Sequence, residues 1–465
     1  MTAPASAIAL GDPAHPITVH IVGIGGAGMS AIATALHSMG HTVTGSDLKA
    51  SGVTDRLRQG GIPVAIGHAG ANVGSADVVA VSSAITGDNP EITEARRRHI
   101  AVVSRSEMLA AVASLRRCIA VAGTHGKTTT ASMLALLMVE ARLRPSFLIG
   151  GDVNEIGTNA VWDEGEWLVV EADESDGTFL ALEPDIAVVT NVEVDHLDHY
   201  GSFAAVRSAF EEFAASARSR CIVGGDDPEA ARLGRSTGAD VVGTGPQCTY
   251  RMVDLELARS AIAFGLLGPG GVELGRLAVP VPGLHNAQNA AVATVAALAA
   301  GVPFDSAARA LARFAGVARR FEFRGVVNGV TFVDDYAHLP TEVRAALAAA
   351  RNGDWQRIVA VLQPHRYSRT AELWEAFGPA FGDADVTVVT DVYGAGEAPV
   401  PGVSGQLVAD AISRSFPEMP VVYAGSRAAL RRTVGELLEP GDLCCTLGAG
   451  DLTSLPDELM SDPSW

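Results

Sequence analysis

The chain has only two lysines, and one of them lies in a segment suited to phosphate binding. Lys127 belongs to the run GTHGKTTT at residues 123–130, which follows a short apolar segment. Backbone N–H groups of such a loop bind phosphates, the lysine reaches the outer ones, and Thr128 is placed to reach a magnesium ion. The spacing departs from the standard phosphate loop because Val121 stands where a first glycine is expected. The run still predicts a nucleoside triphosphate site.

Carboxylates and histidines follow two further apolar segments. Glu171 opens the string EADESD, and the apolar segment Ile186–Val189 precedes TNVEVDHLDH, which contains His196. If both segments are strands of a parallel sheet, the residues after them meet at the same edge of the sheet. Glu171 would then complete a magnesium site beside Thr128. The histidine among its carboxylates suits a second divalent ion or proton transfer.

A second glycine-rich loop lies near the N-terminus. Residues 23–28 match the pattern G-x-G-x-x-G between a predicted strand and a predicted helix, and Asp47 follows some two dozen positions later. Glycines permit a tight turn, and the helix N-terminus offers free N–H groups to a diphosphate. These residues predict a bound nucleotide diphosphate, but they do not distinguish NAD from a UDP-linked ligand.

Two later segments also follow predicted strands and carry polar residues. One is DDYAHLP at residues 334–340, and the other is QPHRYSR at residues 363–369. Arg366 and Arg369 could bind a carboxylate in a bidentate manner. Each segment taken alone is equally compatible with a charged surface patch.

Strand and helix signals alternate along the chain, which is typical of α/β proteins with parallel sheets covered on both faces. We predict three successive α/β units, with boundaries that give domains 1–114, 115–318 and 319–465. The predicted strands are Ile17–Val22, His41–Gly45, Cys118–Ala122, Ile186–Val189, Val330–Val333, Arg357–Leu362, Asp385–Thr390, Pro420–Tyr423 and Leu443–Leu447. The main predicted helices are Gly28–Met39 and one that begins at Lys127.

The composition excludes several classes of function. The 465 residues include 34 Lys+Arg and 53 Asp+Glu, for a net charge of −19, which disfavours binding to nucleic acid or to anionic membranes. The five cysteines are odd in number and Cys444 is adjacent to Cys445, so a reducing compartment is expected. The opening segment Met1–Pro16 has no basic residue and no apolar core of signal-peptide length. We therefore expect a cytoplasmic protein.

Taken together, the motifs resemble those of the Mur ligase family along nearly the whole chain. The resemblance rests on HIVGIGGAGMS, GTHGKTTT, EADESD, TNVEVDHLDHYGS, PGLHNAQNA, RRFEFRG, DDYAH, QPHRYSRT and GAGD, in this order. It implies a Rossmann-like UDP-binding domain, a central ATPase-type domain and a Rossmann-like C-terminal domain. It also implies an ATP-dependent ligase of peptidoglycan synthesis, which joins L-alanine to the lactyl carboxylate of UDP-N-acetylmuramate through an acyl phosphate.

The resemblance also implies roles for individual residues. The UDP-sugar would be bound by Gly23, Gly25, Gly26, Gly28, Asp47, Ser82 and Ser83. ATP would be bound by Gly123, Thr124, His125, Gly126, Lys127, Thr128, Thr129, Asn289, Arg320 and Asp335. Two Mg²⁺ ions would be held by Thr128, Glu171 and His196, and alanine by Tyr336, His338, Arg366 and Arg369. The catalytic residues would be Lys127, Glu171, His196 and His338. His338 and Glu171 are the two candidates for the general base.

Two positions differ from what the family leads us to expect, and one expected residue type is absent. Leu339 stands where many relatives have a second histidine, and Gly396 stands where an arginine is usual. Some Mur ligases use a carbamoylated lysine after the histidine string, but this chain has no lysine beyond Lys127. We hypothesise that Glu211 supplies the equivalent negative charge.

Other functions were weighed against this one. A related ligase that attaches a preformed peptide to the same sugar nucleotide would need a roomier amino-acid pocket. An NAD-dependent oxidoreductase or a catalytically silent nucleotide-binding regulator would leave the phosphate loop and the metal-binding residues without a task. The oligomeric state, and the preference for L-alanine over glycine or L-serine, do not follow from the sequence.

Overall fold

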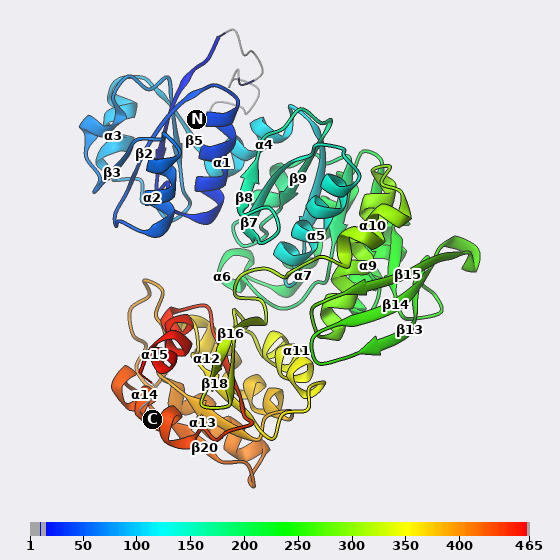
Figure 1. The fold of residues 1–465 in the computed structure, drawn as a ribbon. Helices are drawn as coiled ribbons and strands as arrows, with labels where there is room; N and C mark the ends of the chain where they lie inside the picture. Colours follow the sequence, from blue (N-terminus) through cyan, green and yellow to red (C-terminus); the bar gives the residue numbers. More distant parts are fainter. Residues whose placement is uncertain (1–9, 11–14, 463–465) are drawn as a thin grey trace. The chain divides into compact units, whose positions relative to one another are not determined.

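The fold is described by a computed structural model, which covers residue 10 and residues 15–462. Three β-sheets, each packed against helices, follow one another along the chain (Figure 1). The predicted α/β class is therefore confirmed. None of the helices in the described part of the chain combines the length and apolar character that a bilayer span requires. Most of the segment Met1–Pro16, from which a compartment was predicted, lies outside the described residues.

The first sheet is wholly parallel and has the strand order β3-β2-β1-β4-β5. Its strands are β1 (Thr18–Val22), β2 (Thr42–Asp47), β3 (Val64–Ile66), β4 (Val78–Val81) and β5 (Ala101–Ser104). Its helices are α1 (Ala27–Ser38), α2 (Gly52–Gln59), the 3-10 turn η2 (Gly70–Val73), α3 (Pro90–Arg97) and α4 (Arg105–Ala113). All four residues of β4 are apolar and buried, as expected of a parallel strand covered on both faces.

The second sheet has ten strands in the order β15-β14-β13-β12-β11-β10-β6-β9-β7-β8. The strands are β6 (Arg117–Ala122), β7 (Ser146–Val153), β8 (Thr158–Val161), β9 (Trp167–Glu171), β10 (Ile186–Val189), β11 (Arg220–Gly224), β12 (Asp240–Gly243), β13 (Tyr250–Leu257), β14 (Ile262–Leu267) and β15 (Glu273–Val279). The helical elements are α5 (Lys127–Glu140), η3 (Thr178–Ala181), α6 (Leu197–Tyr200), α7 (Phe203–Ala215), α8 (Pro228–Thr237), η4 (Pro269–Gly271), α9 (Leu284–Ala299) and α10 (Phe304–Leu311).

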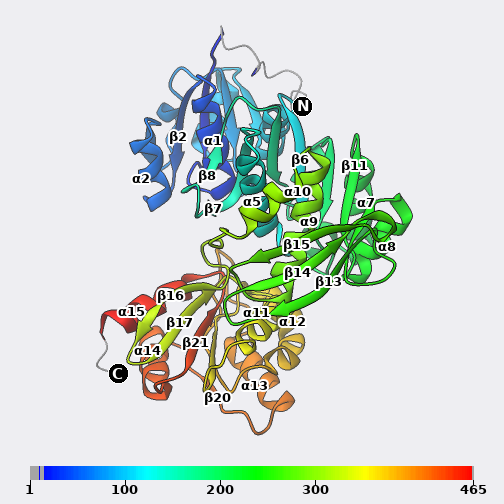
Figure 2. The same ribbon diagram turned by 45° about the vertical axis from the view of Figure 1, so that its right-hand side comes forward.

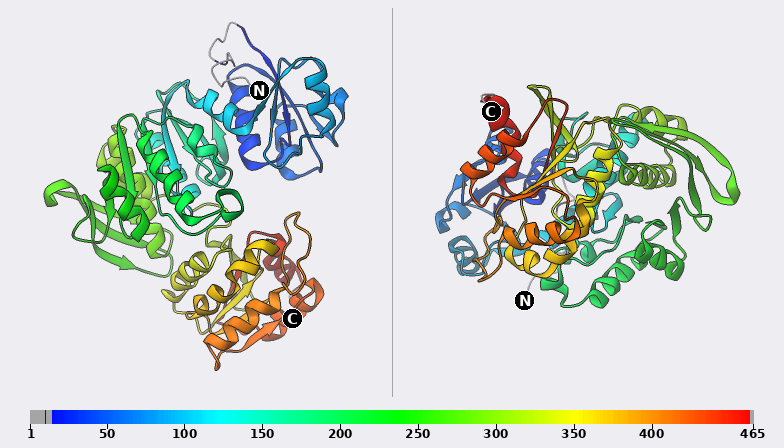
Figure 3. Two further views of the ribbon diagram at one scale, coloured as in Figure 1. Left: turned by 180° about the vertical axis from the view of Figure 1, so that it is seen from behind. Right: turned by 90° about the horizontal axis from the view of Figure 1, so that it is seen from below.

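The third sheet has the order β16-β17-β21-β18-β19-β20, and Figure 2 shows β16, β17 and β21 side by side. The strands are β16 (Glu322–Val327), β17 (Val330–Asp335), β18 (Ile358–Leu362), β19 (Val386–Val389), β20 (Val421–Tyr423) and β21 (Leu443–Leu447). The helical elements are α11 (Pro340–Arg351), α12 (Tyr367–Phe377), η5 (Gly378–Phe381), α13 (Gly405–Ser415), α14 (Arg427–Leu437), η6 (Asp451–Ser454) and α15 (Leu455–Ser461). Figure 3 shows the helices on the faces of the sheets from behind and from below.

Antiparallel pairs occur beside the expected parallel arrangement. Strands β7 and β8 are antiparallel, and so are β16 and β17. The second pair is joined by Asn328 and Gly329 alone, with φ angles of 53° and 78°. Both angles are positive, as a type I′ hairpin turn requires, and Asn-Gly is the favoured sequence for that turn. The first strand predicted for the unit 319–465 was Val330–Val333, so β16 and this hairpin were not predicted.

The chain divides into two compact units. The first contains residues 1–253, 265–277 and 288–313, and the second contains residues 254–264, 278–287 and 314–465. The first sheet and most of the second belong to one unit. A single apolar core joins them, because Met29 and Ile32 of α1 lie in the same cluster of buried residues as Leu148 of β7 and Leu168 of β9.

A buried carboxylate organises the first sheet. Glu91 of α3 has no exposed surface, and its two oxygens accept hydrogen bonds from Ser46 Oγ, Asn72 Nδ2 and the Ala69 amide, with His20 Nε2 at 3.4 Å. Burial opposes the charged form, but the hydrogen bonds outweigh burial and lower the pKa of Glu91 to about 2. The carboxylate thereby connects α3, η2 and the end of β2.

We predict that Glu91→Gln destabilises the first sheet. A pKa lowered from 4.5 to about 2 contributes stability that is present above pH 4.5 and is lost as the pH falls from there toward 2. The contribution of this buried group is roughly 2–3 kcal/mol. At pH 7, amide hydrogen exchange in β1 and β2 should therefore be about 30- to 150-fold faster in the variant.

Two comparisons check this interpretation. The difference between the variant and the unaltered protein should shrink below pH 4.5. Glu94→Gln alters a partly exposed glutamate on the same helix, paired with Arg97, and should leave exchange unchanged. Equal exchange in Glu91→Gln and the unaltered protein at pH 7 would contradict the assigned role of Glu91.

Candidate functional site

The phosphate-type loop lies between β6 and α5, as predicted. Gly123 and Gly126 have φ angles of 133° and 79°, which favour glycine. A Cβ atom on Gly123 would lie 2.1 Å from Thr190 Oγ1, and one on Gly126 would lie 2.4 Å from Asn289 Oδ1. The structure therefore brings Asn289 of α9 against the loop. Gly126 caps α5 without a side-chain hydrogen bond, so the first N–H groups of the helix are open to an anion.

Lys127 is the centre of a set of short polar contacts. Its Nζ donates to Glu174 Oε1 at 2.9 Å, to the Gly123 carbonyl at 2.7 Å and to the Thr124 carbonyl at 3.3 Å. Burial opposes the charge, but the carboxylates of Glu174 and Asp173 raise the pKa of Lys127 above its ordinary value. The lysine is therefore a buried cation held at the loop.

Thr128 and Glu171 lie together, as the sequence predicted. Thr128 Oγ1 donates to Glu171 Oε1 at 2.9 Å, and the Gly150 amide donates to Oε2 of the same carboxylate at 2.6 Å. A Cβ atom on Gly150 would lie 2.7 Å from that oxygen, so this glycine is needed for the contact. Thr129 is buried in the first turn of α5.

The residues after β10 form the other side of the loop. The amide of His125 donates to Asn191 Oδ1 at 2.7 Å, and His125 Nε2 lies 3.2 Å from Glu193 Oε2. The amide of Glu193 donates to Thr124 Oγ1 at 2.9 Å. Side chains from the ends of β6 and β10 thus meet at one edge of the sheet, because these strands are parallel neighbours.

His196 reaches the same cluster through Glu174. Its Nε2 lies 3.3 Å from Asp195 Oδ2 and 3.7 Å from Glu174 Oε1. Tyr200 donates its hydroxyl to the Glu174 carbonyl at 2.6 Å. Glu174 and Tyr200 were not among the predicted site residues. The signal for Glu174 was its place in the quoted acidic string, three residues after Glu171.

Glu211 pairs with another element. Its Oε1 lies 2.9 Å from Arg232 Nη1 of α8, and both side chains are about two-fifths exposed. The carboxylate hypothesised to replace a carbamoylated lysine is therefore already neutralised by a cation.

The N-terminal glycine loop is arranged around Asp47. The Gly25 amide donates to Asp47 Oδ2 at 2.8 Å, and a Cβ atom on Gly25 would lie 2.7 Å from that oxygen. Asp47 therefore holds the loop itself. Gly23 has a φ of 79° and packs against Ser82, and Gly26 caps α1 without a side-chain hydrogen bond.

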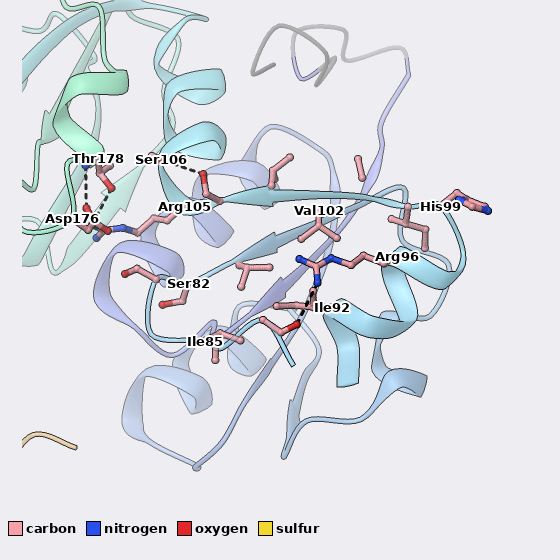
Figure 4. Close-up of a pocket in the computed structure, with 17 residues that line it drawn as sticks. Ser82, Ile85, Ile92, Arg96, His99, Val102, Arg105, Ser106, Asp176 and Thr178 are labelled. Atoms are coloured by element: carbon pink, nitrogen blue, oxygen red, sulfur yellow. Dashed lines mark hydrogen bonds and ion pairs between the residues drawn. The ribbon is translucent and has the colours of Figure 1, made fainter. Parts of the chain in front are cut away.

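A pocket of about 760 Å³ lies beside this loop (Figure 4). Ser82 and Ser83 line it, together with Arg105, Asp176 and Thr178. It also has an apolar wall, which includes Ile85, Ile92 and Val102. Of the predicted sugar-nucleotide residues, Ser82 and Ser83 line this cavity, whereas the glycine loop 23–28 and Asp47 are not among its lining residues. The cavity is large enough for a small-molecule ligand.

The second unit brings together the residues after β17. Asp335 accepts hydrogen bonds from the Phe321 amide at 2.7 Å and the Ala337 amide at 2.8 Å. Burial raises the pKa of Asp335 to about 6, while the nearby Arg320 acts in the opposite direction. Arg320 also lies over the ring of Tyr336, with 5.1 Å between the guanidinium carbon and the ring centroid.

Rings and guanidinium groups surround His338. Its ring centroid lies 5.3 Å from that of Tyr336 and 5.7 Å from that of His365, which stacks on Tyr393. Arg369 Nη1 lies 3.2 Å from His365 Nδ1. Burial, His338 and the adjacent arginines lower the pKa of His365 to about 3, so its ring is neutral.

The two positions that differ from the family pattern have clear surroundings. Leu339 is buried and caps α11, and the next residue, Pro340, begins the helix. Gly396 has a φ of 92°, a conformation that an arginine would rarely adopt. Arg366 lies at the N-cap of α12, and its amide donates to the Tyr393 carbonyl at 2.8 Å.

Comparison with known proteins identifies the class of protein. Family models match residues 18–117 (Mur ligase family, catalytic domain), 121–297 (Mur ligase middle domain) and 319–450 (Mur ligase, glutamate ligase domain). The chain belongs to the Mur ligase family.

The chain is similar to proteins from one branch of this family. The chain is 44% identical to UDP-N-acetylmuramate–L-alanine ligase of Brucella anthropi, over 95% of this chain and 97% of that one. It is 45% identical to the enzyme of the same name from Rhizobium meliloti, over 95% and 96%. Among solved structures, UDP-N-acetylmuramate–alanine ligase of Thermotoga maritima has a TM-score of 0.81 and 28% identity, over 96% of this chain and 98% of that one.

We predict that Arg320→Leu raises the pKa of Asp335 above its value of about 6, because the variant loses the cation that favours the carboxylate. Since the folded pKa is raised from 3.8, this carboxyl disfavours folding as the pH rises from 3.8 to 6. The Phe321 amide reports the ionisation through its hydrogen bond, and it can be followed by NMR on ¹⁵N-phenylalanine-labelled protein.

The titration has a matched control. Arg324→Leu removes a neighbouring arginine that pairs with Asp457, and it should leave the Phe321 midpoint in place. A midpoint that is the same in Arg320→Leu and the unaltered protein would contradict the proposed effect of Arg320.

Proposed function

We propose that the protein joins L-alanine to the lactyl carboxylate of UDP-N-acetylmuramate and converts ATP to ADP and phosphate. The proposal is carried by relatives of that name, 43–45% identical over about 95% of the chain. The phosphate loop supports it, because a buried lysine between carboxylates suits phosphoryl transfer and has no task in hydride transfer. The cytoplasm, where UDP-sugars and ATP are available, is the compartment that we propose.

Three regions take the three substrates in this proposal. The domain 1–114 binds the UDP portion through Gly23, Gly25, Gly26, Gly28, Ser82 and Ser83, with Asp47 shaping the loop. The domain 115–318 binds ATP through Gly123, Thr124, His125, Gly126, Lys127, Thr128, Thr129 and Asn289. The domain 319–465 adds Arg320 and Asp335 toward ATP and binds alanine through Tyr336, His338, Arg366 and Arg369.

The donor groups at the phosphate loop fit magnesium. The described residues include no group of three or more His, Cys, Asp or Glu side chains that could enclose a metal ion by themselves. Mg²⁺ commonly takes one or two carboxylates together with substrate phosphates and water, so no such enclosure is needed. Glu174 Oε2 is buried without a hydrogen-bond partner, which leaves unused negative charge beside Lys127. We propose that Thr128 and Glu171 hold one ion and His196 a second. Bound Mg²⁺ would neutralise negative charge on the phosphates.

The first step brings two anions together. The lactyl carboxylate attacks the γ-phosphorus of ATP, which gives an acyl phosphate and ADP. Lys127 neutralises negative oxygens during this step, and the open N–H groups of α5 orient the phosphates. Burial of the lysine excludes water and strengthens the attraction.

In the second step the neutral amine of alanine attacks the acyl carbon, and the tetrahedral intermediate expels phosphate. We propose His338 as the general base. Its Nδ1 lies 3.0 Å from the Tyr336 carbonyl and 3.2 Å from Glu342, so these two groups orient the ring. Glu171, the other candidate, already accepts hydrogen bonds on both oxygens.

Phosphate release tests the proposed reaction. We expect release from Mg·ATP only when UDP-N-acetylmuramate and L-alanine are both present. Lys127→Ala should lower the rate at least about 100-fold, because the main neutralising cation is lost. Release that needs a tripeptide in place of L-alanine would assign the chain to peptide attachment instead. No release with any combination would refute the ligase.

The metal assignment has its own test. Glu171→Gln removes a charge from the proposed magnesium site and should raise the Mg²⁺ concentration for half-maximal ATP binding about tenfold or more, as measured by calorimetry. Glu183→Gln alters an exposed glutamate paired with Arg218 and should leave this concentration unchanged. If Glu171→Gln also leaves it unchanged, Glu171 is not a ligand.

A further inference from the structure

Arg105 lies between the two nucleotide-binding regions of the first unit. It is the first residue of α4, directly after the edge strand β5. A capping box between Ser104 and Glu107 fixes the start of this helix, with the Ser104 amide donating to Glu107 at 2.7 Å. The arginine therefore leaves the first sheet from a well-defined point, and its side chain is only 17% exposed.

One nitrogen of Arg105 binds the acidic segment after β9 (Figure 4). Nη2 lies 3.0 Å from Asp173 Oδ2, 2.8 Å from Asp176 Oδ2 and 3.2 Å from Thr178 Oγ1. This contact joins residues about 70 positions apart and connects the first sheet to the second. A guanidinium with several donors suits such multiple recognition, whereas a lysine offers a single point charge.

The same acidic segment faces the phosphate loop. Glu174 holds Lys127 Nζ at 2.9 Å, and Tyr200 holds the Glu174 carbonyl. Asp173 accepts from Arg105 Nη2, and the adjacent Glu174 accepts from Lys127 Nζ. Two consecutive carboxylates thus each hold one of the two cations.

The other edge of the guanidinium is directed elsewhere. Nε is buried and, among the described residues, has no hydrogen-bond partner. A Cβ atom on Gly28, in the N-terminal glycine loop, would lie 3.2 Å from Nη1. Arg105 also lines the pocket that Ser82 and Ser83 border. An anionic oxygen in this pocket would therefore meet Nη1 while Nη2 remains on the acidic segment.

We propose that Arg105 is a positioning residue that couples the sugar-nucleotide site to the ATP site. An anionic oxygen of the sugar nucleotide binds Nη1 of the guanidinium, and Nη2 then holds the segment 173–176 in the position that places Lys127 for the phosphates of ATP. This inference rests on the proposed function. It predicts that each substrate tightens the binding of the other by the same factor.

Calorimetry measures this coupling directly. The affinity for UDP-N-acetylmuramate is determined with and without a non-hydrolysable Mg·ATP analogue. We expect about 5- to 100-fold tighter binding with the analogue in the unaltered protein. In Arg105→Leu the ratio should fall close to one, and Arg105→Lys should restore affinity for the sugar nucleotide without restoring the ratio.

Two further variants separate coupling from simple loss of structure. Arg56 of α2 also pairs across the two sheets, with Asp152 at 2.7 Å, but this pair is exposed and far in sequence from the acidic segment. Arg56→Leu should keep the full ratio. Asp176→Asn leaves Arg105 in place and removes one of its partners, so it should lower the ratio even if Arg105→Leu fails to fold.

The ligand series identifies the oxygen that Arg105 binds. UDP carries the diphosphate alone, UDP-N-acetylglucosamine adds the sugar, and UDP-N-acetylmuramate adds the carboxylate. If all three ligands show coupling, Arg105 binds the diphosphate. If only UDP-N-acetylmuramate shows coupling, Arg105 binds the carboxylate. Either result supports the proposal if the coupling is lost in Arg105→Leu.

The inference and the proposed function can fail separately. If the unaltered protein forms no product with L-alanine, the proposed function fails. If it forms product but shows no coupling, or if the ratio stays unchanged in Arg105→Leu and Asp176→Asn, the coupling role of Arg105 is overturned.

Discussion

The buried ammonium group of Lys127 depends on carboxylates that reach it from another strand. Glu174 holds it at 2.9 Å, and the carbonyls of Gly123 and Thr124 complete its surroundings. A buried cation without such partners would be strongly destabilising, so the loop, the acidic segment after β9 and the residues after β10 must be formed together. The ends of three neighbouring parallel strands, β6, β9 and β10, meet this requirement because they lie at one edge of the sheet.

The glycines of the two loops allow close contacts with neighbouring side chains. Gly123 and Gly126 pass within contact distance of Thr190 and Asn289, where a Cβ atom would overlap their side chains. Gly25 makes room for Asp47 in the N-terminal loop in the same way. In both loops the close approach leaves helix N–H groups without a side-chain cap and open to anions. The first two sheets share one apolar core, so the two loops belong to one compact unit, and Arg105 can reach from one sheet to the acidic segment of the other.

Much of the fold could be predicted from local patterns, and less of the site. The strands Ile186–Val189 and Leu443–Leu447 were predicted to the residue, because buried parallel strands are continuous apolar runs bounded by polar residues. The β16–β17 hairpin was missed although Asn328 and Gly329 signalled it. Glu174 lay in the quoted acidic string, but its contact with Lys127, 47 positions away, was not predicted. Arg105 was not predicted either, because its partners are about 70 positions away and no local pattern reports a contact at that distance.

The sequence by itself determined the α/β class, the phosphate-type loop and its lysine, the acidic and histidine strings and the membership of the Mur ligase family. These depend on residue types and on short spacings, which local physics fixes. Only the tertiary structure decided which carboxylate holds Lys127, that Asp47 accepts a hydrogen bond from the glycine loop, that Glu211 pairs with Arg232 and that Arg105 reaches the acidic segment after β9. These contacts form between side chains that the edge of a sheet brings within about 3 Å of each other. The order of the strands in the sheet, and not the distance along the sequence, determines which side chains those are.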